Sequence, residues 1–278
     1  YLKLLYPYLL RDSYIIDKHI LWINTNDEGD KRFALSLAKE YPSFFEIRQQ
    51  DINKIGKHFN GDLYRYCIDR NTIYIFIDDD ICWIDVNAIR NILDFRIKHK
   101  DYFVIYPLVI NANLTTCIHQ SMGLLPMKID DKLIWHDRHY IDLSNFSPEI
   151  SCYIHEMFLN KLKNNQLADL CINKYILGFN QPTTCHVGCW FGDDFVYFNR
   201  PNDIHDINFI TQIEPHSRGK SSCLCGDSIF VHFAFNNHEK YLLTDTNLFD
   251  QYSVLSDKVN KYVRCLDYVQ LRKLTKNK

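Results

Sequence analysis

Three consecutive aspartates are the residues in this 278-residue chain best suited to metal chemistry. Asp78, Asp79 and Asp80 directly follow an apolar run at 72–77, and apolar residues resume at Ile81. Adjacent carboxylates repel one another unless a cation neutralises them. In an extended segment, Asp78 and Asp80 project to one side and Asp79 to the other. The pattern predicts that Asp78 and Asp80 bind Mn²⁺ or Mg²⁺ together with a phosphate group, with helix capping as the structural alternative.

Two further stretches place polar side chains among apolar ones. His232 interrupts the run 229-IFVHFAF-235, where a histidine is either hydrogen-bonded in the core or used as a ligand. Asp193 and Asp194 lie in 190-WFGDDF-195, which also fits a turn followed by a helix cap. These three side chains are therefore candidates for both structural and functional roles.

The first 110 residues alternate between strand and helix patterns. Strands are expected at 19–25, 44–50, 72–77 and 102–110, and helices at 1–12, 28–41, 54–69 and 85–99, the last capped by Asp85. This alternation is typical of an α/β fold with a mostly parallel sheet, whose ligand sites lie beyond the carboxyl ends of the strands. Asn24 and Thr25 end the first of these strands, so we expect them to share a crevice with the acidic run.

The second half of the chain is less regular. Residues 111–148 are expected to be loop-like, 151–177 helical with a break near 164–166, 229–235 a strand, and 238–273 helical. No repeat or linker divides the chain, which favours one domain.

Composition narrows the classes of function. The net charge of -2 gives no electrostatic footprint for nucleic acid. No run of 18 or more apolar residues predicts a membrane span. The ten cysteines are scattered, which favours reduced thiols and a cytoplasmic protein. The sequence begins at Tyr1, within a helical pattern, so we expect it to be part of a longer chain.

An ordered set of motifs resembles a known group of enzymes. The motifs are 20-ILWINT-25, 74-YIFIDDDICWI-84, 94-DFRI-97, 102-YFVIYPLVINANLTTCIHQSMGLLP-126, 190-WFGDDF-195 and 230-FVHFAF-235. Together they resemble nucleotide-sugar glycosyltransferases of the GT-A fold, and more narrowly a family of GT-A-like proteins from bacteria, fungi and large viruses. The resemblance covers about residues 1–255. It implies one Rossmann-like domain over 1–278, with a mixed, mostly parallel central sheet flanked by helices. Residues 1–110 would bind the nucleotide sugar, and 111–278 would form the acceptor half.

The resemblance also implies roles for the acidic residues. In that fold the Asp-x-Asp carboxylates hold a divalent ion on the donor diphosphate, which corresponds to Asp78 and Asp80 here, with His232 as a further ligand. An acidic residue near the acceptor serves as general base, which corresponds to Asp194 or Asp193. The implied activity is metal-dependent transfer of a sugar from a nucleotide-diphosphate donor, with UDP favoured, to a glycan or polysaccharide.

Several side chains are expected to contact the donor or the acceptor. Arg65 precedes the strand of the acidic run, and Arg218 and Lys220 lie on a basic loop that would close over the diphosphate. The family tends to have Gly-Arg-Pro there, whereas this chain reads 217-SRGKSS-222. The full set of expected binding residues is Asn24, Thr25, Arg65, Asp78, Asp79, Asn111, His119, Gln120, Arg218 and Lys220.

Two other classes of function compete with the transferase. Aspartate clusters at strand ends also serve metal-dependent phosphohydrolases and nucleases, although the near-neutral charge argues against a nuclease. A non-catalytic glycan-binding module is the third possibility. It is disfavoured because Asp78, Asp80, Asp194 and His232 are all present.

Overall fold

The computed structural model of the chain describes most of its residues. These are residues 1–50, 61–126, 128–129, 132–133, 144, 146–179, 181, 183, 185–196 and 208–265. The elements form a mixed α/β fold, which confirms the coarse prediction of fold class.

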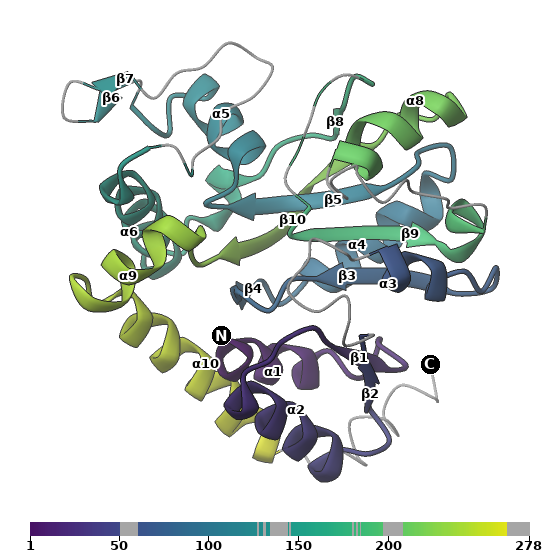
Figure 1. Cartoon of the computed structure of the whole chain (residues 1–278). Helices are drawn as coiled ribbons and strands as arrows, with labels where there is room; N and C mark the ends of the chain where they lie inside the picture. Colours follow the sequence, from purple (N-terminus) through teal and green to yellow (C-terminus); the bar gives the residue numbers. More distant parts are fainter. Residues whose placement is uncertain are drawn as a thin grey trace.

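A six-stranded mixed sheet forms the centre of the fold (Figure 1). Its strands are β3 (Ile73–Ile77), β9 (Val187–Phe191), β5 (Ile105–Ile110), β10 (Cys223–His232) and β4 (Ile81–Ile84), in that spatial order, with β8 (Tyr175–Ile176) also paired to β10. The pair β5–β10 is parallel. The pairs β3–β9, β5–β9, β4–β10 and β8–β10 are antiparallel. The described pairings of this sheet are therefore mixed rather than mostly parallel as expected, because β9 lies between β3 and β5 in the opposite direction.

These directions decide which chain segments meet at each end of the sheet. Strands β3, β5 and β10 run the same way and end at one edge, which we call the carboxyl edge. Because β9 runs the opposite way, it begins at the carboxyl edge, where Val187 pairs with Ile77, and ends at the amino edge, where Phe191 pairs with Ile73. The segment before β9 therefore belongs with the acidic run, and the segment after it does not.

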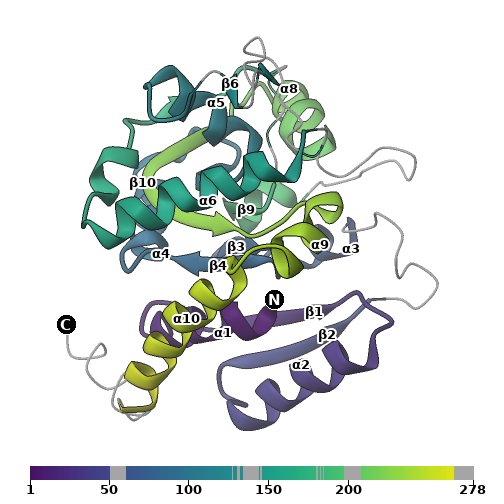
Figure 2. The same cartoon turned by 90° about the vertical axis from the view of Figure 1, so that its left-hand side faces the viewer.

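Helices cover the sheet and its ends (Figures 1 and 2). Helix α4 (Ala88–Lys98) packs against β5, β9 and β10, while α5 (Asn113–Ser121) and α6 (Pro148–Lys163) pack against β5. Helices α1 (Leu2–Arg11) and α10 (Leu248–Cys265) pack against each other and against β4. Helix α9 (Asn236–Thr244) joins α6 to α10. The remaining helical turns are α3 (Gly61–Tyr66), η3 (Leu167–Leu170), η4 (Gly192–Phe195), η5 (Phe209–Ile213) and α8 (Glu214–Arg218).

A smaller layer lies beside the central sheet. Strands β1 (His19–Ile23) and β2 (Phe45–Gln49) pair in parallel and are covered by α2 (Glu28–Glu40). Asp27 caps α2 by accepting hydrogen bonds from the backbone of Gly29 and Asp30, which satisfies two donors that a helix start leaves open. Two further strands of two residues each, β6 (Lys128–Ile129) and β7 (Lys132–Leu133), pair in an antiparallel manner and complete the described strands.

Several expected boundaries differ from those observed. The N-cap position of α4 is Asn87, which makes no capping hydrogen bond with its side chain, rather than Asp85. The Asp85 side chain instead accepts a hydrogen bond from the Asn87 backbone. Residues 111–148 are not all loop, because α5 forms there despite its polar sequence, with six of its nine residues buried. Tertiary packing thus overrides weak local helix propensity. The helix expected at 238–273 is divided between α9 and α10, and residues 51–60 and 266–278 lie outside the described residues.

All ten cysteines are free thiols. None of the described helices is long and apolar enough to cross a membrane.

Replacing Gly226 with alanine is expected to destabilise the protein by about 1–3 kcal/mol, the usual cost of overpacking. A Cβ at Gly226, where β10 shifts register, would overlap the backbone carbonyl of Ile172, which cannot move aside like a flexible side chain. Gly178 is the matched control, since a Cβ there would meet no atom within 4 Å. Urea denaturation should show a lower midpoint for Gly226→Ala only, and equal midpoints for both variants would contradict this account.

Candidate metal centre

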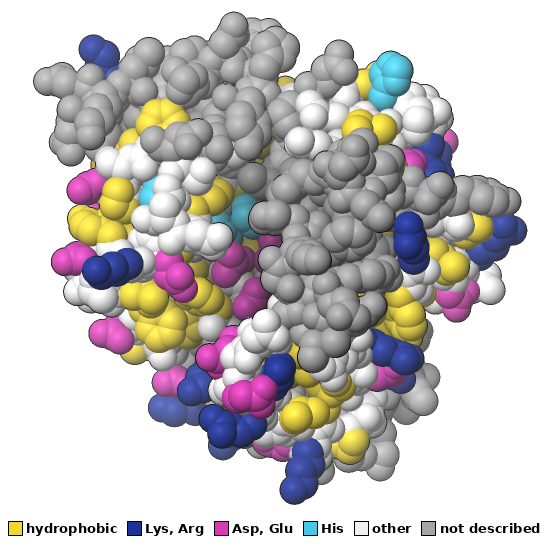
Figure 3. All heavy atoms as spheres, in the orientation of Figure 1, with side chains coloured by type: hydrophobic (Ala, Val, Ile, Leu, Met, Phe, Trp, Pro, Cys, Tyr) yellow, Lys and Arg dark blue, Asp and Glu magenta, His cyan; other side chains and the backbone are white. Residues whose placement is uncertain are grey.

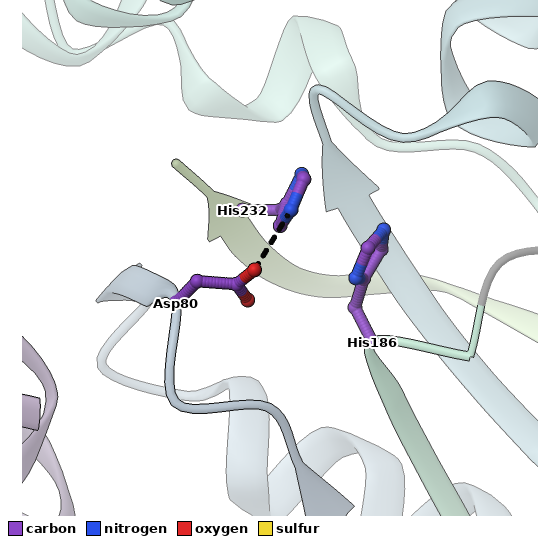
Figure 4. Close-up of side chains that lie close together, drawn as sticks. All are labelled: Asp80, His186 and His232. Carbon is purple, nitrogen blue, oxygen red and sulfur yellow. Dashed lines mark hydrogen bonds and ion pairs between the residues drawn. The ribbon is translucent and has the colours of Figure 1, made fainter. Parts of the chain in front are cut away.

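Three side chains that are far apart in the sequence converge at the carboxyl edge (Figure 4). Asp80 lies in the turn between β3 and β4, His186 directly precedes β9, and His232 ends β10. One ligand atom from each lies within 4.8 Å of the others. They are brought together because β3 and β10 end at this edge and β9 begins there. We call these residues the Asp-His-His cluster.

His232 is held between a backbone carbonyl and a carboxylate. Its Nδ1 lies 3.0 Å from the carbonyl oxygen of Asn111, and its Nε2 lies 3.1 Å from Asp80 Oδ2. Burial alone would lower the pKa of His232, but the Asp80 carboxylate outweighs it and raises that pKa above the ordinary value. Conversely, burial alone would raise the pKa of Asp80, but the charge and hydrogen bond of His232 lower it. Without a metal, the two side chains therefore form an ion pair.

His186 contributes an imidazole that has no positive charge. Burial, together with the nearby charge of His232, lowers the pKa of His186 to about 3. Its Nδ1 lies 3.2 Å from Asp78 Oδ2, and its backbone carbonyl accepts a hydrogen bond of 2.8 Å from the Asp78 backbone. The ring stacks on that of His232, with 3.8 Å between centroids. His186 Nε2 and Asp80 Oδ1 are buried and have no hydrogen-bond partner among the described residues.

Asn111, one of the expected binding residues, instead supports His232. It is fully buried and has a positive φ of 59°, a left-handed conformation that asparagine tolerates better than most residues. Its side-chain amide donates to the backbone carbonyls of His232 and Phe233, while its own carbonyl faces His232 Nδ1. Asn111 therefore fixes both the end of β10 and the orientation of the imidazole.

A cleft of about 1150 Å³ opens beside the cluster, between β1 and β3. Asn24, Thr25, Asp78 and Asp79 line it, which confirms that the ends of these two strands share one crevice. Asn24 Oδ1 is buried there without a partner among the described residues. Acidic and histidine side chains gather near the middle of the face in Figure 3, next to the residues drawn in grey.

Asp193 and Asp194 do not line this cleft, although its lining extends to Ile73 and Trp190 near the same end of the sheet. They follow β9 and so lie at the amino edge, opposite the acidic run. Asp194 is buried, accepts a hydrogen bond from the Phe191 backbone, and forms ion pairs with Arg96 at 3.1 Å and Lys220 at 2.9 Å. We therefore discard both aspartates as candidate general bases. The motif alone does not reveal this location, because it does not show the direction of β9.

The expected basic loop is likewise at the amino edge. Lys220 pairs with Asp194, and Arg218 pairs with Glu214 while its guanidinium lies over the ring of Phe103. Phe103 lies two residues before β5, at the end of the sheet opposite the Asp-His-His cluster. Arg218 and Lys220 are therefore not positioned to contact a diphosphate held by the acidic run.

Three other expected binding residues lie outside the cleft lining. His119 is buried and its Nε2 lies 3.0 Å from the Leu170 carbonyl, which ties α5 to η3. Gln120 donates a hydrogen bond to the Pro126 carbonyl. Arg65 is exposed on α3. The polar contacts of His119 and Gln120 fit structural roles.

His186 was not among the ligands expected from the sequence. The only local signal is its position immediately before the short apolar run 187-VGCWF-191. That position points to the metal centre only once β9 is known to run antiparallel to β3.

Comparisons of this chain with models of known protein families, with curated proteins and with solved structures give no match.

Proposed function

We propose that this protein is a metal-dependent glycosyltransferase that uses a nucleotide-diphosphate sugar, with UDP favoured, and a glycan or polysaccharide acceptor. The observation that supports the proposal most is the acidic run at a strand end, which borders both the Asp-His-His cluster and a cleft of about 1150 Å³. A cleft of this size accommodates a ligand at least as large as typical small-molecule ligands. The sequence resemblance supports the same activity.

The proposed roles are metal binding by the Asp-His-His cluster and donor binding by the residues that line the cleft. Asp80, His186 and His232 would hold a divalent ion, which when bound neutralises negative charge on a leaving diphosphate. Asn24 and Thr25 would contact the nucleoside from the opposite wall of the cleft. Asp79, which is exposed and lines the cleft, would accept hydrogen bonds from sugar hydroxyls. We assign no general base.

Calorimetric titration of UDP, GDP and their sugars tests this proposal. We expect one nucleoside diphosphate to bind in the presence of Mn²⁺, and binding to be lost when Mn²⁺ is removed or in Asp80→Ala. Asp101→Asn, which changes an exposed aspartate before β5 at the amino edge, is the control and should bind as the parent does. Failure of every nucleotide to bind the folded parent would contradict the proposal.

A phosphohydrolase is the second candidate because two histidines and one carboxylate also form catalytic metal sites in hydrolases. The two reactions break different bonds of the same substrate. A glycosyltransferase releases UDP from a UDP-sugar, whereas a phosphohydrolase cuts within the diphosphate and releases UMP and a sugar phosphate. Phosphorus NMR of the products therefore decides between the two.

A further inference from the structure

We infer that the Asp-His-His cluster binds a first-row transition ion in preference to Mg²⁺, with Asp80, His186 and His232 as the protein ligands and Asp78 as a support for His186. This inference rests on the metal dependence in the proposed function and names the class of ion. It differs from the expectation that Asp78 and Asp80 together clamp the metal.

The surroundings of His232 fix which nitrogen is free to bind. A carbonyl oxygen only accepts hydrogen bonds, so the contact with Asn111 places the proton on Nδ1. The lone pair of Nε2 then points toward Asp80 Oδ2, 3.1 Å away. Two acceptors face each other in this way only if a cation or a proton lies between them. A backbone carbonyl behind an imidazole is also the usual support for a metal-binding histidine.

The same reasoning applies to His186. Asp78 Oδ2 accepts the Nδ1–H of the ring, and Asp78 is further tied to His186 through the backbone hydrogen bond. The lone pair of Nε2 is left buried and unpartnered among the described residues, as is Asp80 Oδ1. Leaving such groups unpaired destabilises the folded protein, and a bound ion would remove that cost. Asp78 is thus engaged by His186 and supports the ligand from behind.

The type of ligand atoms indicates the class of ion. Mg²⁺ prefers oxygen ligands and retains several waters, whereas imidazole nitrogen suits Zn²⁺, Co²⁺, Fe²⁺ and other first-row ions. Three protein ligands leave coordination positions open for oxygens of a substrate. The Asp80 side chain is about a quarter exposed, so the cluster lies close to the protein surface.

Titration of the metals alone into the chelator-treated full chain tests the inference. We expect Co²⁺ and Zn²⁺ to bind more tightly than Mn²⁺, following the general order of divalent affinities, and Mg²⁺ to bind most weakly. Co²⁺ also reports its ligands through visible absorption. No binding of any transition ion by the folded parent would overturn the inference, as would equal affinity for Co²⁺ and Mg²⁺.

Co²⁺ binding by substituted proteins distinguishes the proposed metal ligands from the supporting residue Asp78. His186→Ala and Asp80→Asn should each weaken Co²⁺ binding by more than 100-fold and change the absorption spectrum. Asp78→Asn should weaken it by only about 10–100-fold, the usual effect of losing an outer partner, because the amide oxygen still accepts from His186 Nδ1. If His186→Ala does not fold, His186→Gln keeps the side-chain volume and serves instead. The controls are His216→Ala, an exposed histidine on α8, and Asp101→Asn.

One pattern of results would overturn the ligand assignment. If Asp78→Asn loses as much affinity as Asp80→Asn while His186→Ala binds normally, the two carboxylates clamp the metal. Because no nucleotide is present in these titrations, their outcome is independent of the donor-binding test. Metal binding without nucleotide binding would contradict the transferase and leave the metal centre intact.

Discussion

Asp194→Ala is expected to lower the free energy of unfolding by about 3–5 kcal/mol, the usual cost of leaving a buried charge without its partner. The side chains of Arg96 and Asp194 are 0% and 8% exposed. Arg96 also donates to the backbone carbonyls of Lys100 and Tyr102, and it lies over the ring of Phe191. These contacts hold the guanidinium in place after its carboxylate partner is removed, so the charge stays buried.

Asp193→Ala is the matched control for this prediction. Asp193 is the adjacent residue and also pairs with an arginine, but Asp193 and Arg70 are each 64% exposed. Exposed ion pairs contribute about 0–1 kcal/mol, so this variant should unfold nearly as the parent does. Guanidinium denaturation of both variants measures the difference. Equal losses would show that Asp194 has no special structural role, and would reopen its candidacy for catalysis.

Lowering the pH from about 6.5 to 4 is expected to remove about 3 kcal/mol of stability through His155 alone, at 1.36 kcal/mol per pKa unit. Burial lowers the pKa of His155 to about 4, although the hydrogen bond to the Phe233 carbonyl opposes the shift. Between these pH values the unfolded chain binds a proton that the folded protein excludes. Stability therefore falls as the pH falls through this window, and it is independent of this group above it.

The contacts of His155 show why it stays neutral. Its Nε2 donates to the Phe233 carbonyl and its Nδ1 accepts from the Tyr252 hydroxyl, so the ring joins α6 to β10 and α10. His155→Gln should be less stable at pH 7 but should lose less stability on acidification. His216→Gln changes an exposed histidine and should keep the parent's pH dependence. Urea denaturation across this pH range measures both effects. An unchanged slope in His155→Gln would contradict the prediction.

The polar side chains at the two edges of the sheet differ in how they are paired. The carboxyl edge carries the Asp-His-His cluster, in which two ligand atoms lack partners among the described residues. The amino edge carries Asp194, Arg96 and Lys220, whose charges compensate one another. Buried polar groups are usually paired, so each unpaired one calls for an explanation such as a bound ion or ligand. Arg96 Nε at the amino edge is also unpaired among the described residues, but the charge of its guanidinium is compensated by Asp194.

The local features could be predicted from the amino-acid sequence. An apolar run followed by Asp78, Asp79 and Asp80 predicted a strand that ends in candidate ligands, and the alternation of elements predicted an α/β fold with Asn24 near them. His232 was identified because a histidine in an apolar strand needs a partner. Each of these inferences depends on neighbouring residues only, where burial and periodicity are strong signals.

Which of these side chains lie together depends on how the strands pair in the folded protein. The run 187-VGCWF-191 reads the same whether β9 is parallel or antiparallel to β3, yet its direction exchanges the two ends of the strand. The antiparallel pairing brings His186 to the metal centre and carries Asp194 to the opposite edge. Asn111 similarly changes from a pocket residue to a support for His232, because a left-handed turn buries it. Strand direction arises from long-range pairing, which local sequence patterns do not encode.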